Sequence, residues 1–466
     1  MKIFVISILS LITQGAVMIL SLSLASAFLD DFALKEWNLG IASYAFVSLF
    51  DFGASTFILR DLASGEKIRV ASAKDLSKTM IICGFVLSLF FLTLNFFVLT
   101  ETTYLIIIGA MLGRVIINII GVMNAAFGRI IVEKGSKIIF GLTMIFSQYL
   151  LLSYNFGVYS LAISIYISVI IQFTFLYYVN DIFRNIIKTS KFNLLSIWNN
   201  RVEHINWLLY TLPAFFIFNF QIFAIGFWSE TDNVALYNTI HQLLYTVIAI
   251  SGVVSYVSGP AISRLNFISK QSRNTLIIHT AKVVSTSVAI GLSIVLMFLP
   301  IIQDVMFKNI NLTVNFNLWV LFAFYIIIEV FQMSMVNALI YTGHTDFWKV
   351  NFSSAFLNTT LCWLLIPSYG LLGAVLSIII AQTLTCNFFN IRLSFKKLEI
   401  PWNKALFVLF ISLLFFTINI SLYCILYNNI IALIFSIIII ILLFIKYIMN
   451  SLRFIVDEYY LIKIDE

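Results

Sequence analysis

The chain has 466 residues, of which 61% are hydrophobic and only 11% are charged, and its formal net charge is +7. Soluble globular proteins have about 45–50% apolar and about 25% charged residues, so this composition excludes an ordinary soluble protein. Together with a mean hydropathy of +1.02, it indicates an integral membrane protein. The excess of Lys and Arg is explained by cytoplasmic loops, which collect positive charge, and no nucleic acid partner is expected.

Long apolar runs follow one another along the whole chain. A bilayer-spanning helix needs about 20 mostly apolar residues, and about 14 such runs can be drawn. In chain order they are Ile3–Phe28, Leu39–Leu59, Thr79–Leu99, Tyr104–Phe127, Ile138–Tyr154, Val158–Val179, Trp207–Trp228, Val234–Val257, Val283–Ile302, Asn317–Tyr341, Val350–Ile366, Leu371–Ile391, Ala405–Leu426 and Ile430–Ile448. Strands of a membrane barrel would show alternation over about ten residues instead. The sequence therefore predicts an all-α polytopic membrane protein.

The distribution of Lys and Arg predicts the orientation of these spans. If the N-terminus is cytoplasmic, every Lys and Arg except Lys35, Lys308 and Arg114 lies in a cytoplasmic segment. The positive-inside rule then places both termini in the cytoplasm. Lys2, the apolar run and Ala25–Ala27 resemble a cleavable secretory signal, but the run is longer than a usual signal core, so we expect it to stay in place.

Several classes of chemistry are not expected. The four cysteines, Cys83, Cys362, Cys386 and Cys424, lie in apolar runs without the spacing of a metal site or of a CxxC motif, so they are interpreted as small buried hydrophobes. The chain has no P-loop for ATP and no pattern for covalent catalysis. Neither a metal nor a cofactor is expected, and the chain is not expected to be an enzyme.

An internal repeat organises the spans. Phe156–Ser164, at the start of the sixth run, matches Tyr369–Ser377, at the start of the twelfth, in its aromatic, glycine and serine positions, and Lys137 and Lys349 precede the fifth and eleventh runs. Two six-helix lobes with an even number of spans each form a parallel repeat, and transporters built in this way hold substrate between their halves. The predicted domains are 1–200 and 201–400 for the lobes, and 401–466 for two additional helices and a short tail.

Three short motifs carry a resemblance to a known family. They are Ser48–Gly53 with Leu59–Leu62 around the end of the second span, Gly259–Arg264 at the end of the eighth, and Pro367–Ala374 before the twelfth. With them the chain resembles the polysaccharide-exporter family (Wzx-type O-antigen and lipid-linked oligosaccharide flippases) of the multidrug/oligosaccharidyl-lipid/polysaccharide (MOP) superfamily. The resemblance implies a MATE-like fold of two six-helix lobes plus two C-terminal helices.

The same resemblance implies a function. Such a flippase moves an undecaprenyl-diphosphate-linked oligosaccharide, an O-antigen unit or similar, from the cytoplasmic to the periplasmic leaflet by alternating access. The implied location is the bacterial cytoplasmic (inner) membrane, in lipopolysaccharide or other polysaccharide biosynthesis. The expected partners are the lipid-linked glycan, the lipid bilayer, H⁺ or Na⁺, a polysaccharide polymerase and a chain-length regulator.

Arginine suits the diphosphate of this substrate, because it stays charged and its planar fork of donors matches phosphate oxygens. Arg114 lies near the middle of the fourth span, where a charge is costly, and Asn118 is on the same helix face. We predict both as headgroup-binding residues, with structural pairing to a carboxylate or to carbonyl groups as the alternative. Arg60 and Arg264, at the cytoplasmic ends of repeat-related spans, are further headgroup candidates or ordinary positive-inside anchors.

Three titratable residues inside spans are candidates for ion coupling. Glu329 is near the middle of the tenth span, which is the repeat partner of the fourth; Asp51 is deep in the second span; and His241 is on a polar face of the eighth. Burial raises the pKa of a carboxyl group, and histidine titrates near neutral pH. The alternative for each is a structural partner within the protein.

Two other functions stay open at this stage. The first is a MATE-type cation-coupled drug exporter, which requires acidic residues to outnumber basic ones in the cavity. The second is a membrane polysaccharide polymerase, although such enzymes usually carry a large charged external loop that this sequence lacks.

Overall fold

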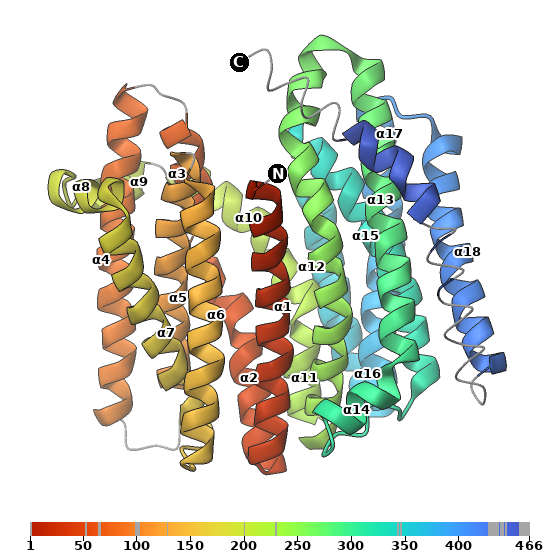
Figure 1. Cartoon of the computed structure of the whole chain (residues 1–466), viewed down its shortest axis with the longest axis horizontal. Coiled ribbons are helices and arrows are strands. Elements are labelled where there is room, and N and C mark those ends of the chain that lie inside the picture. Colours follow the sequence, from red (N-terminus) through yellow and green to blue (C-terminus); the bar gives the residue numbers. More distant parts are fainter. Residues whose placement is uncertain are drawn as a thin grey trace. The chain divides into compact units, whose positions relative to one another are not determined.

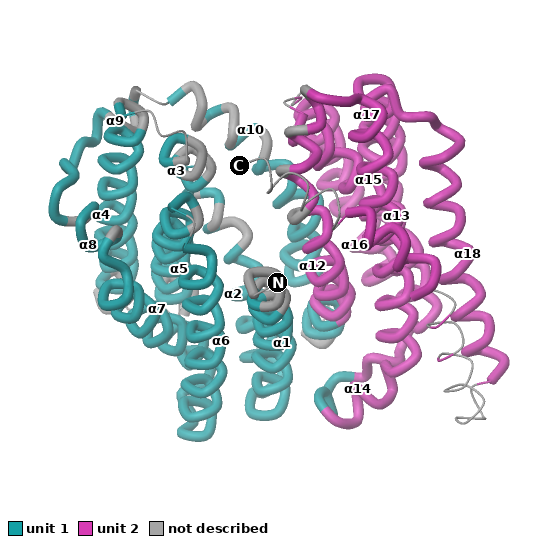
Figure 2. Tube along the Cα trace, turned by 45° about the horizontal axis from the view of Figure 1, so that its top comes forward, with its two compact units in different colours: residues 1–239, 306–310 teal, residues 240–305, 311–466 magenta. Residues whose placement is uncertain are grey.

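The computed structural model (Figure 1) describes residues 2–51, 54–63, 67–97, 103–127, 129–199, 201–228, 231–342, 344, 347–426, 438, 442 and 445–455, some of them by their backbone alone. Helices make up the described chain, and no strand occurs in these ranges. The chain forms two compact units, residues 1–239 with 306–310 and residues 240–305 with 311–466 (Figure 2). The predicted all-α membrane fold is confirmed.

The first unit contains the N-terminal helices. They are α1 (Lys2–Phe28), α2 (Asp31–Val47), the 3₁₀ helix η1 (Ser48–Asp51), α3 (Ala54–Ala63), α4 (Lys67–Phe97), α5 (Thr103–Ala126), α6 (Ile130–Ser153), α7 (Tyr159–Val179), α8 (Asp181–Thr189), α9 (Leu194–Asn199), α10 (Arg201–Phe218), α11 (Phe220–Trp228) and the start of α12 (Thr231–Ile268). Within this unit α4, α5, α6 and α7 run alongside one another (Figure 1).

Helix α5 is the centre of the first unit. It packs against α2, α3, α4, α6 and α7, and 78% of its most apolar stretch is buried, the highest share among the described spans. Ala110, Ile116 and Ile120 are almost completely enclosed. The helix that carries Arg114 is therefore surrounded by protein on most sides.

The second unit continues from α12. It contains α13 (Lys270–Met297), most of α14 (Leu299–Met306), α15 (Phe316–Tyr341), α16 (Trp348–Gln382), the π-helical turn η2 (Thr383–Asn387), α17 (Phe388–Leu398) and α18 (Trp402–Leu426). Its central helix is α15, which packs against α13, α16, α17 and α18 and is 72% buried over its most apolar stretch. Glu329 lies on this helix, so each unit has one charged candidate residue on its central helix.

The second predicted span is not one continuous helix. It consists of α2, η1 and α3, and the interruption falls at Asp51. The Asp51 carboxylate accepts hydrogen bonds from the Ser55 backbone N–H at 3.2 and 3.3 Å. Side chains of this type compete with the backbone for hydrogen bonds and so favour helix starts over helix interiors, which explains why the apolar run alone did not predict the break.

The seventh and eighth spans also differ from the prediction. The seventh is broken between α10 and α11, which are bent by 40°, and the Gln221 side chain donates to the Ile217 carbonyl at 2.7 Å near the bend. In an apolar medium a broken helix requires such substitutes for its lost backbone bonds. The eighth span continues as α12 to Ile268, beyond the predicted end at Val257.

The turn predicted between the eleventh and twelfth spans is present inside α16. Gly370 has φ 53° and ψ −125° and divides the helix there, a conformation that glycine adopts without steric cost. At Gly373 a Cβ atom would lie 2.4 Å from the Leu365 carbonyl oxygen. The two glycines therefore allow the two spans to turn and to approach each other closely.

Among the described residues, nine helices are long and apolar enough to cross a membrane, or ten when the bent pair is counted as one span. About 14 spans is consistent with this arrangement. The predicted fourteenth span, Ile430–Ile448, lies mostly outside the described residues. The division into domains 1–200, 201–400 and 401–466 stays a prediction.

Replacing Gly373 by alanine is expected to lower the thermal unfolding temperature of the purified protein, because the new methyl group collides with backbone that cannot move aside, and overpacking costs about 1–3 kcal/mol. Gly252→Ala is the matched control in the same unit, since nothing lies within 4 Å of its Cβ position. Fluorescence-monitored unfolding in detergent compares the two. Equal unfolding temperatures would contradict the close approach at Gly373.

Candidate functional site

Arg114 stacks on two aromatic rings in the first unit. Its guanidinium carbon lies 4.1 Å from the centroid of the Tyr44 ring on α2 and 5.3 Å from that of Phe140 on α6. Both distances are within the range of cation–π attraction. The ring faces of α2 and α6 thus hold the cation of α5 in place, and they do so without using its N–H donors.

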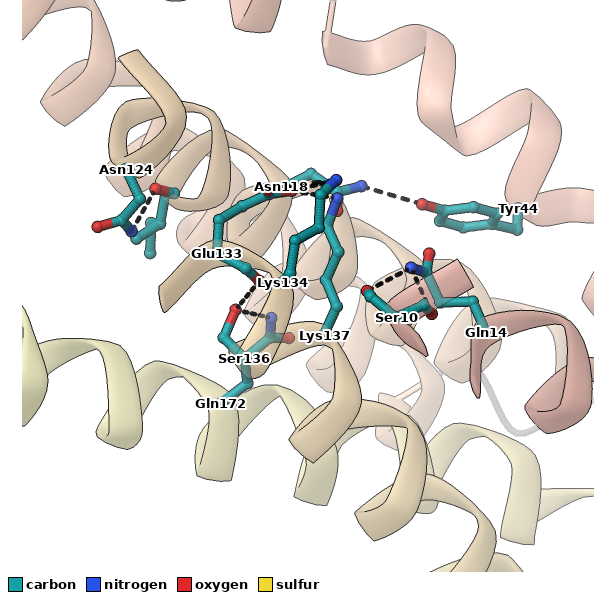
Figure 3. A network of polar contacts seen from close by, with 11 residues as sticks. Ser10, Gln14, Tyr44, Asn118, Asn124, Glu133, Lys134, Ser136, Lys137 and Gln172 are labelled. Carbon is teal, nitrogen blue, oxygen red and sulfur yellow. Dashed lines mark hydrogen bonds and ion pairs between the residues drawn. The ribbon is translucent and has the colours of Figure 1, made fainter. Parts of the chain in front are cut away.

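Asn118 belongs to the same arrangement, as predicted from its helix face. It lies one turn after Arg114 on α5, and its Nδ2 donates to the Tyr44 hydroxyl at 3.1 Å (Figure 3). Tyr44 is therefore fixed from two sides, by the amide at its hydroxyl and by the guanidinium over its ring. Sequence analysis did not identify Tyr44 as a site residue, because a tyrosine in an aromatic-rich chain has no distinguishing local pattern.

The structural alternative for Arg114 is a carboxylate or carbonyl partner. In the described part of the chain, Arg114 forms neither an ion pair nor a hydrogen bond. An arginine carries five N–H donors, and no other described residue uses those of Arg114.

Arg273 in the second unit shows what a structural arginine looks like in this fold. It is only 5% exposed, and its guanidinium donates to the Leu398 carbonyl at 2.6 Å and to Asn266 at 2.6 Å, with two further bonds to Asn274. Its donors are used to join α13 to the end of α17. Arg114 has the opposite arrangement, with ring contacts and no hydrogen-bond partner among the described residues.

A charged cluster on α6 lies next to this site. Glu133 is 6% exposed, and its carboxylate contacts the Lys137 Nζ at 2.6 Å and the Lys134 Nζ at 3.3 Å. A Cβ atom at Gly121 of α5 would lie 3.3 Å from the Glu133 Cγ, so this side chain is held against α5. Sequence analysis placed the two lysines in a cytoplasmic segment and missed the cluster, although the i, i+4 spacing of Glu133 and Lys137 is a readable signal.

Glu329 is enclosed in the second unit. It is 2% exposed, and its Oε2 accepts a hydrogen bond from the Tyr325 hydroxyl at 3.1 Å. Glu329 thus has a neutral hydrogen-bond partner, and no lysine or arginine among the described residues forms an ion pair with it.

His241 belongs to an aromatic cluster that extends to Tyr325, the hydrogen-bond partner of Glu329. Its ring stacks on Tyr245 with centroids 4.0 Å apart and lies 6.4 Å from Phe322, and the Phe322 ring is parallel to that of Tyr325. The structure therefore connects His241 and Glu329, two predicted coupling residues, through the rings of α12 and α15.

The other predicted site residues are placed differently. Asp51 lies in η1, which packs against α5, and its carboxylate is engaged at the start of α3. Arg60 is part of α3 and Arg264 is part of α12 by their backbones, but their side chains are outside the described residues. Their predicted roles stay predictions.

Outside the spans, an exposed ion pair provides a contrast to these buried groups. The Lys270 Nζ donates to the Glu399 Oε1 at 2.9 Å, with both side chains more than half exposed. This hydrogen bond lowers the pKa of the Glu399 carboxyl from its ordinary value.

Solved structures of known proteins match the fold of this chain, whereas sequence comparisons find no match. No family model matches the chain, and no curated protein sequence does. Among solved structures, the lipid II flippase MurJ in an inward closed conformation matches with a TM-score of 0.65 and 14% identity, over 95% of this chain and 100% of that one. An inward-facing MATE-family multidrug transporter of the MOP superfamily matches with a TM-score of 0.64 and 12% identity, over 83% and 94%. The MATE transporter VcmN of Vibrio cholerae matches with a TM-score of 0.58 and 14% identity, over 85% and 96%.

The availability of the Arg114 donors can be tested by stability. Arg114→Met is expected to leave the thermal unfolding temperature unchanged or to raise it, because it removes a half-buried charge from an apolar span and leaves no hydrogen-bond or ion-pair partner among the described residues unsatisfied. Arg273→Met is expected to lower it, since unpaired buried acceptors cost about 1–3 kcal/mol. If the unfolding temperature falls as far for Arg114→Met as for Arg273→Met, Arg114 is a structural arginine.

At the 12–14% identity of these solved structures, the likeness concerns architecture, and the chain has the fold that MurJ and the MATE transporters share.

Proposed function

We propose that this protein is a flippase for an undecaprenyl-diphosphate-linked oligosaccharide, an O-antigen unit or a similar surface polysaccharide precursor. It works by alternating access, receiving the headgroup at the cytoplasmic leaflet and releasing it at the periplasmic leaflet of the bacterial inner membrane, with both termini in the cytoplasm. It acts as a transporter and not as an enzyme, and it hands its substrate to a polysaccharide polymerase and a chain-length regulator.

One observation carries this proposal: Arg114 is fixed on the central helix of the first unit by two aromatic rings, with no hydrogen bond or ion pair within the described residues. An arginine in an apolar environment costs several kcal/mol, so a position that leaves its donors unused calls for an anionic ligand. The charge-assisted, bidentate bonds of a guanidinium suit phosphate oxygens.

The sugars and the polyprenyl chain of the substrate need few specific contacts with the protein. Amide and hydroxyl groups beside Arg114, such as those of Asn118 and Tyr44, suit the hydroxyls of the first sugars. The polyprenyl chain stays in the lipid and needs no enclosed pocket. The fold likeness to a lipid II flippase agrees with a lipid-linked substrate.

We assign ion coupling to Glu329. A carboxyl group enclosed with Tyr325, and connected through rings to Tyr245 and His241, binds a proton or Na⁺ with a large change in local charge. A bound ion shifts a conformational equilibrium only through its different affinity for the two states. Asp51 is a second coupling candidate, and Arg60 and Arg264 are candidates for the first contact with the headgroup.

A second candidate function is a MATE-type, cation-coupled drug exporter. It is favoured by the likeness to MATE transporters and by the aromatic cluster around Glu329, since aromatic rings and a carboxylate attract organic cations. The polymerase alternative has less support, because the similar structures are transporters or flippases.

A strain lacking this gene distinguishes these functions. Single repeat units trapped on the lipid carrier, without surface glycan, are expected for the flippase. Unpolymerised single units at the surface would indicate a polymerase. Normal glycan together with new sensitivity to cationic dyes would indicate the drug exporter.

In this strain, Arg114→Ala is expected to abolish flipping, while Arg114→Lys retains part of it, because lysine keeps the charge but loses the planar fork. The measurement is the ratio of trapped lipid-linked units to surface glycan after expression of each variant. Arg184→Ala, on the exposed helix α8 where Arg184 pairs with Asp181, is the control and should complement fully. Normal complementation by the alanine variant at position 114 would remove Arg114 from the mechanism.

For coupling, Glu329→Gln is expected to abolish the dependence of transport on a proton or sodium gradient in proteoliposomes, because the amide still accepts from Tyr325 but cannot be charged. The exposed carboxylate variant Glu399→Gln is the control and should respond to the gradient as the unmodified protein does. Gradient-dependent transport by the glutamine variant at position 329 would show that the ion is bound elsewhere.

A further inference from the structure

The cluster of Glu133, Lys134 and Lys137 on α6 has no role in the function described so far. It is unusual in its charge, because two lysines contact one carboxylate. The lysine side chains are 15% and 29% exposed, whereas that of Glu133 is 8% exposed. The carboxylate is therefore the enclosed member, and Lys137 is the member most open to a ligand.

The register of α5 and α6 places this cluster close to Arg114. Arg114 is level with Phe140 of α6, and Gly121 is level with Glu133, as their contacts show. Lys137 is three residues before Phe140, which is about 5 Å along a helix axis. Both lysine side chains extend in the direction of Asn118 (Figure 3). Arg114 and Lys137 thus follow each other, about one helical turn apart in register, along the face where α5 and α6 meet.

We propose that Lys137 binds the second phosphate of the diphosphate whose first phosphate is held by Arg114, and that Glu133 is an internal anion that occupies Lys137 while the headgroup is absent. This inference rests on the flippase function proposed above and deepens it.

The chemistry of the two anions supports the exchange. An ammonium group has three N–H donors, and the short contact with Glu133 uses one of them. A diphosphate brings more charge than a carboxylate and takes the remaining donors, so it displaces Glu133 from Lys137 without needing to expel it from its place against α5. When the headgroup leaves, Glu133 returns, so Lys137 is not left as an unpaired cation in an apolar surrounding.

This competition makes an unusual prediction: removing an acidic side chain strengthens binding, and only as long as Lys137 is present. With the full-length protein in nanodiscs and undecaprenyl diphosphate without sugars as the probe, Glu133→Gln is expected to lower Kd about threefold to tenfold. Lys137→Gln is expected to raise Kd about tenfold. In the Lys137→Gln background, adding Glu133→Gln should change nothing further, which a double-mutant cycle measures.

The exposed pair in the second unit provides the matched control. Glu399→Gln removes one negative charge next to a lysine, Lys270, in the same way, and it should leave Kd unchanged. A tighter Kd for Glu133→Gln that persists without Lys137, or that also occurs with Glu399→Gln, would overturn the proposal, because both would show a general effect of net charge.

A second measurement does not depend on the folding of the Glu133 variant. If Lys137 holds one of two phosphates, Lys137→Gln should reduce the preference for undecaprenyl diphosphate over undecaprenyl monophosphate, whereas an equal loss for both lipids would contradict the assignment. Sodium diphosphate as competitor tests the source of the anion. Competition as strong as that of the lipid would overturn a lipid-linked ligand in favour of a soluble one.

The failure of this inference differs from the failure of the proposed function. If Arg114→Ala loses binding of undecaprenyl diphosphate while the Glu133 and Lys137 variants bind as the unmodified protein does, the flippase proposal stands and the exchange is wrong. If Arg114→Ala binds normally, the proposed function itself is contradicted.

Discussion

The placement of charge inside an apolar helix bundle is the constraint on which this structure depends. A charge in such a medium is costly unless it is paired or hydrogen-bonded, and the fold meets this cost in different ways. Arg273 uses its donors on a carbonyl and two amides, Glu133 shares its charge with two lysines, and Glu329 accepts from a tyrosine. Arg114 alone among these four is stabilised by ring faces that leave its donors unused. It is therefore the one whose surroundings leave room for an anionic partner from outside the chain.

The same constraint explains why the two candidate centres lie on the central helices. Helices α5 and α15 are the most enclosed spans of their units, and a charged side chain there is kept away from lipid by its neighbours. Both units have a helix of this kind, but the charged side chains on the two helices differ in sign. Arg114 suits an anionic substrate and Glu329 suits a cation or a proton. This difference in charge is consistent with the two proposed roles, headgroup binding in the first unit and ion coupling in the second.

The sequence was sufficient to predict the helical membrane fold. In lipid, apolar runs of about 20 residues can satisfy their backbone hydrogen bonds only as helices or closed barrels. It also singled out Arg114, Asn118 and Glu329, which interrupt such runs and whose roles stay predictions. The breaks at Asp51 and at the bend before α11 were missed, since they depend on local side-chain hydrogen bonds that composition does not reveal. Tyr44 and Lys137 were missed for another reason. Their importance comes from which helices pack against α5, and a single sequence gives the spacing of residues along a helix but not the orientation of that helix in the bundle.

The sign of the charge around α5 also bears on the choice between the two proposed substrates. An organic cation that approached Arg114 would meet two further cations, Lys134 and Lys137, and one carboxylate that both of them already use. Like charges at short range repel in a low dielectric, so this face of the first unit opposes a cationic drug and attracts a phosphate. The aromatic rings at Arg114 do not alter this balance, because Tyr44 and Phe140 direct their faces to the guanidinium and are not available to a second cation. The charges in the first unit therefore support the proposed lipid diphosphate over the proposed cationic drug as the substrate.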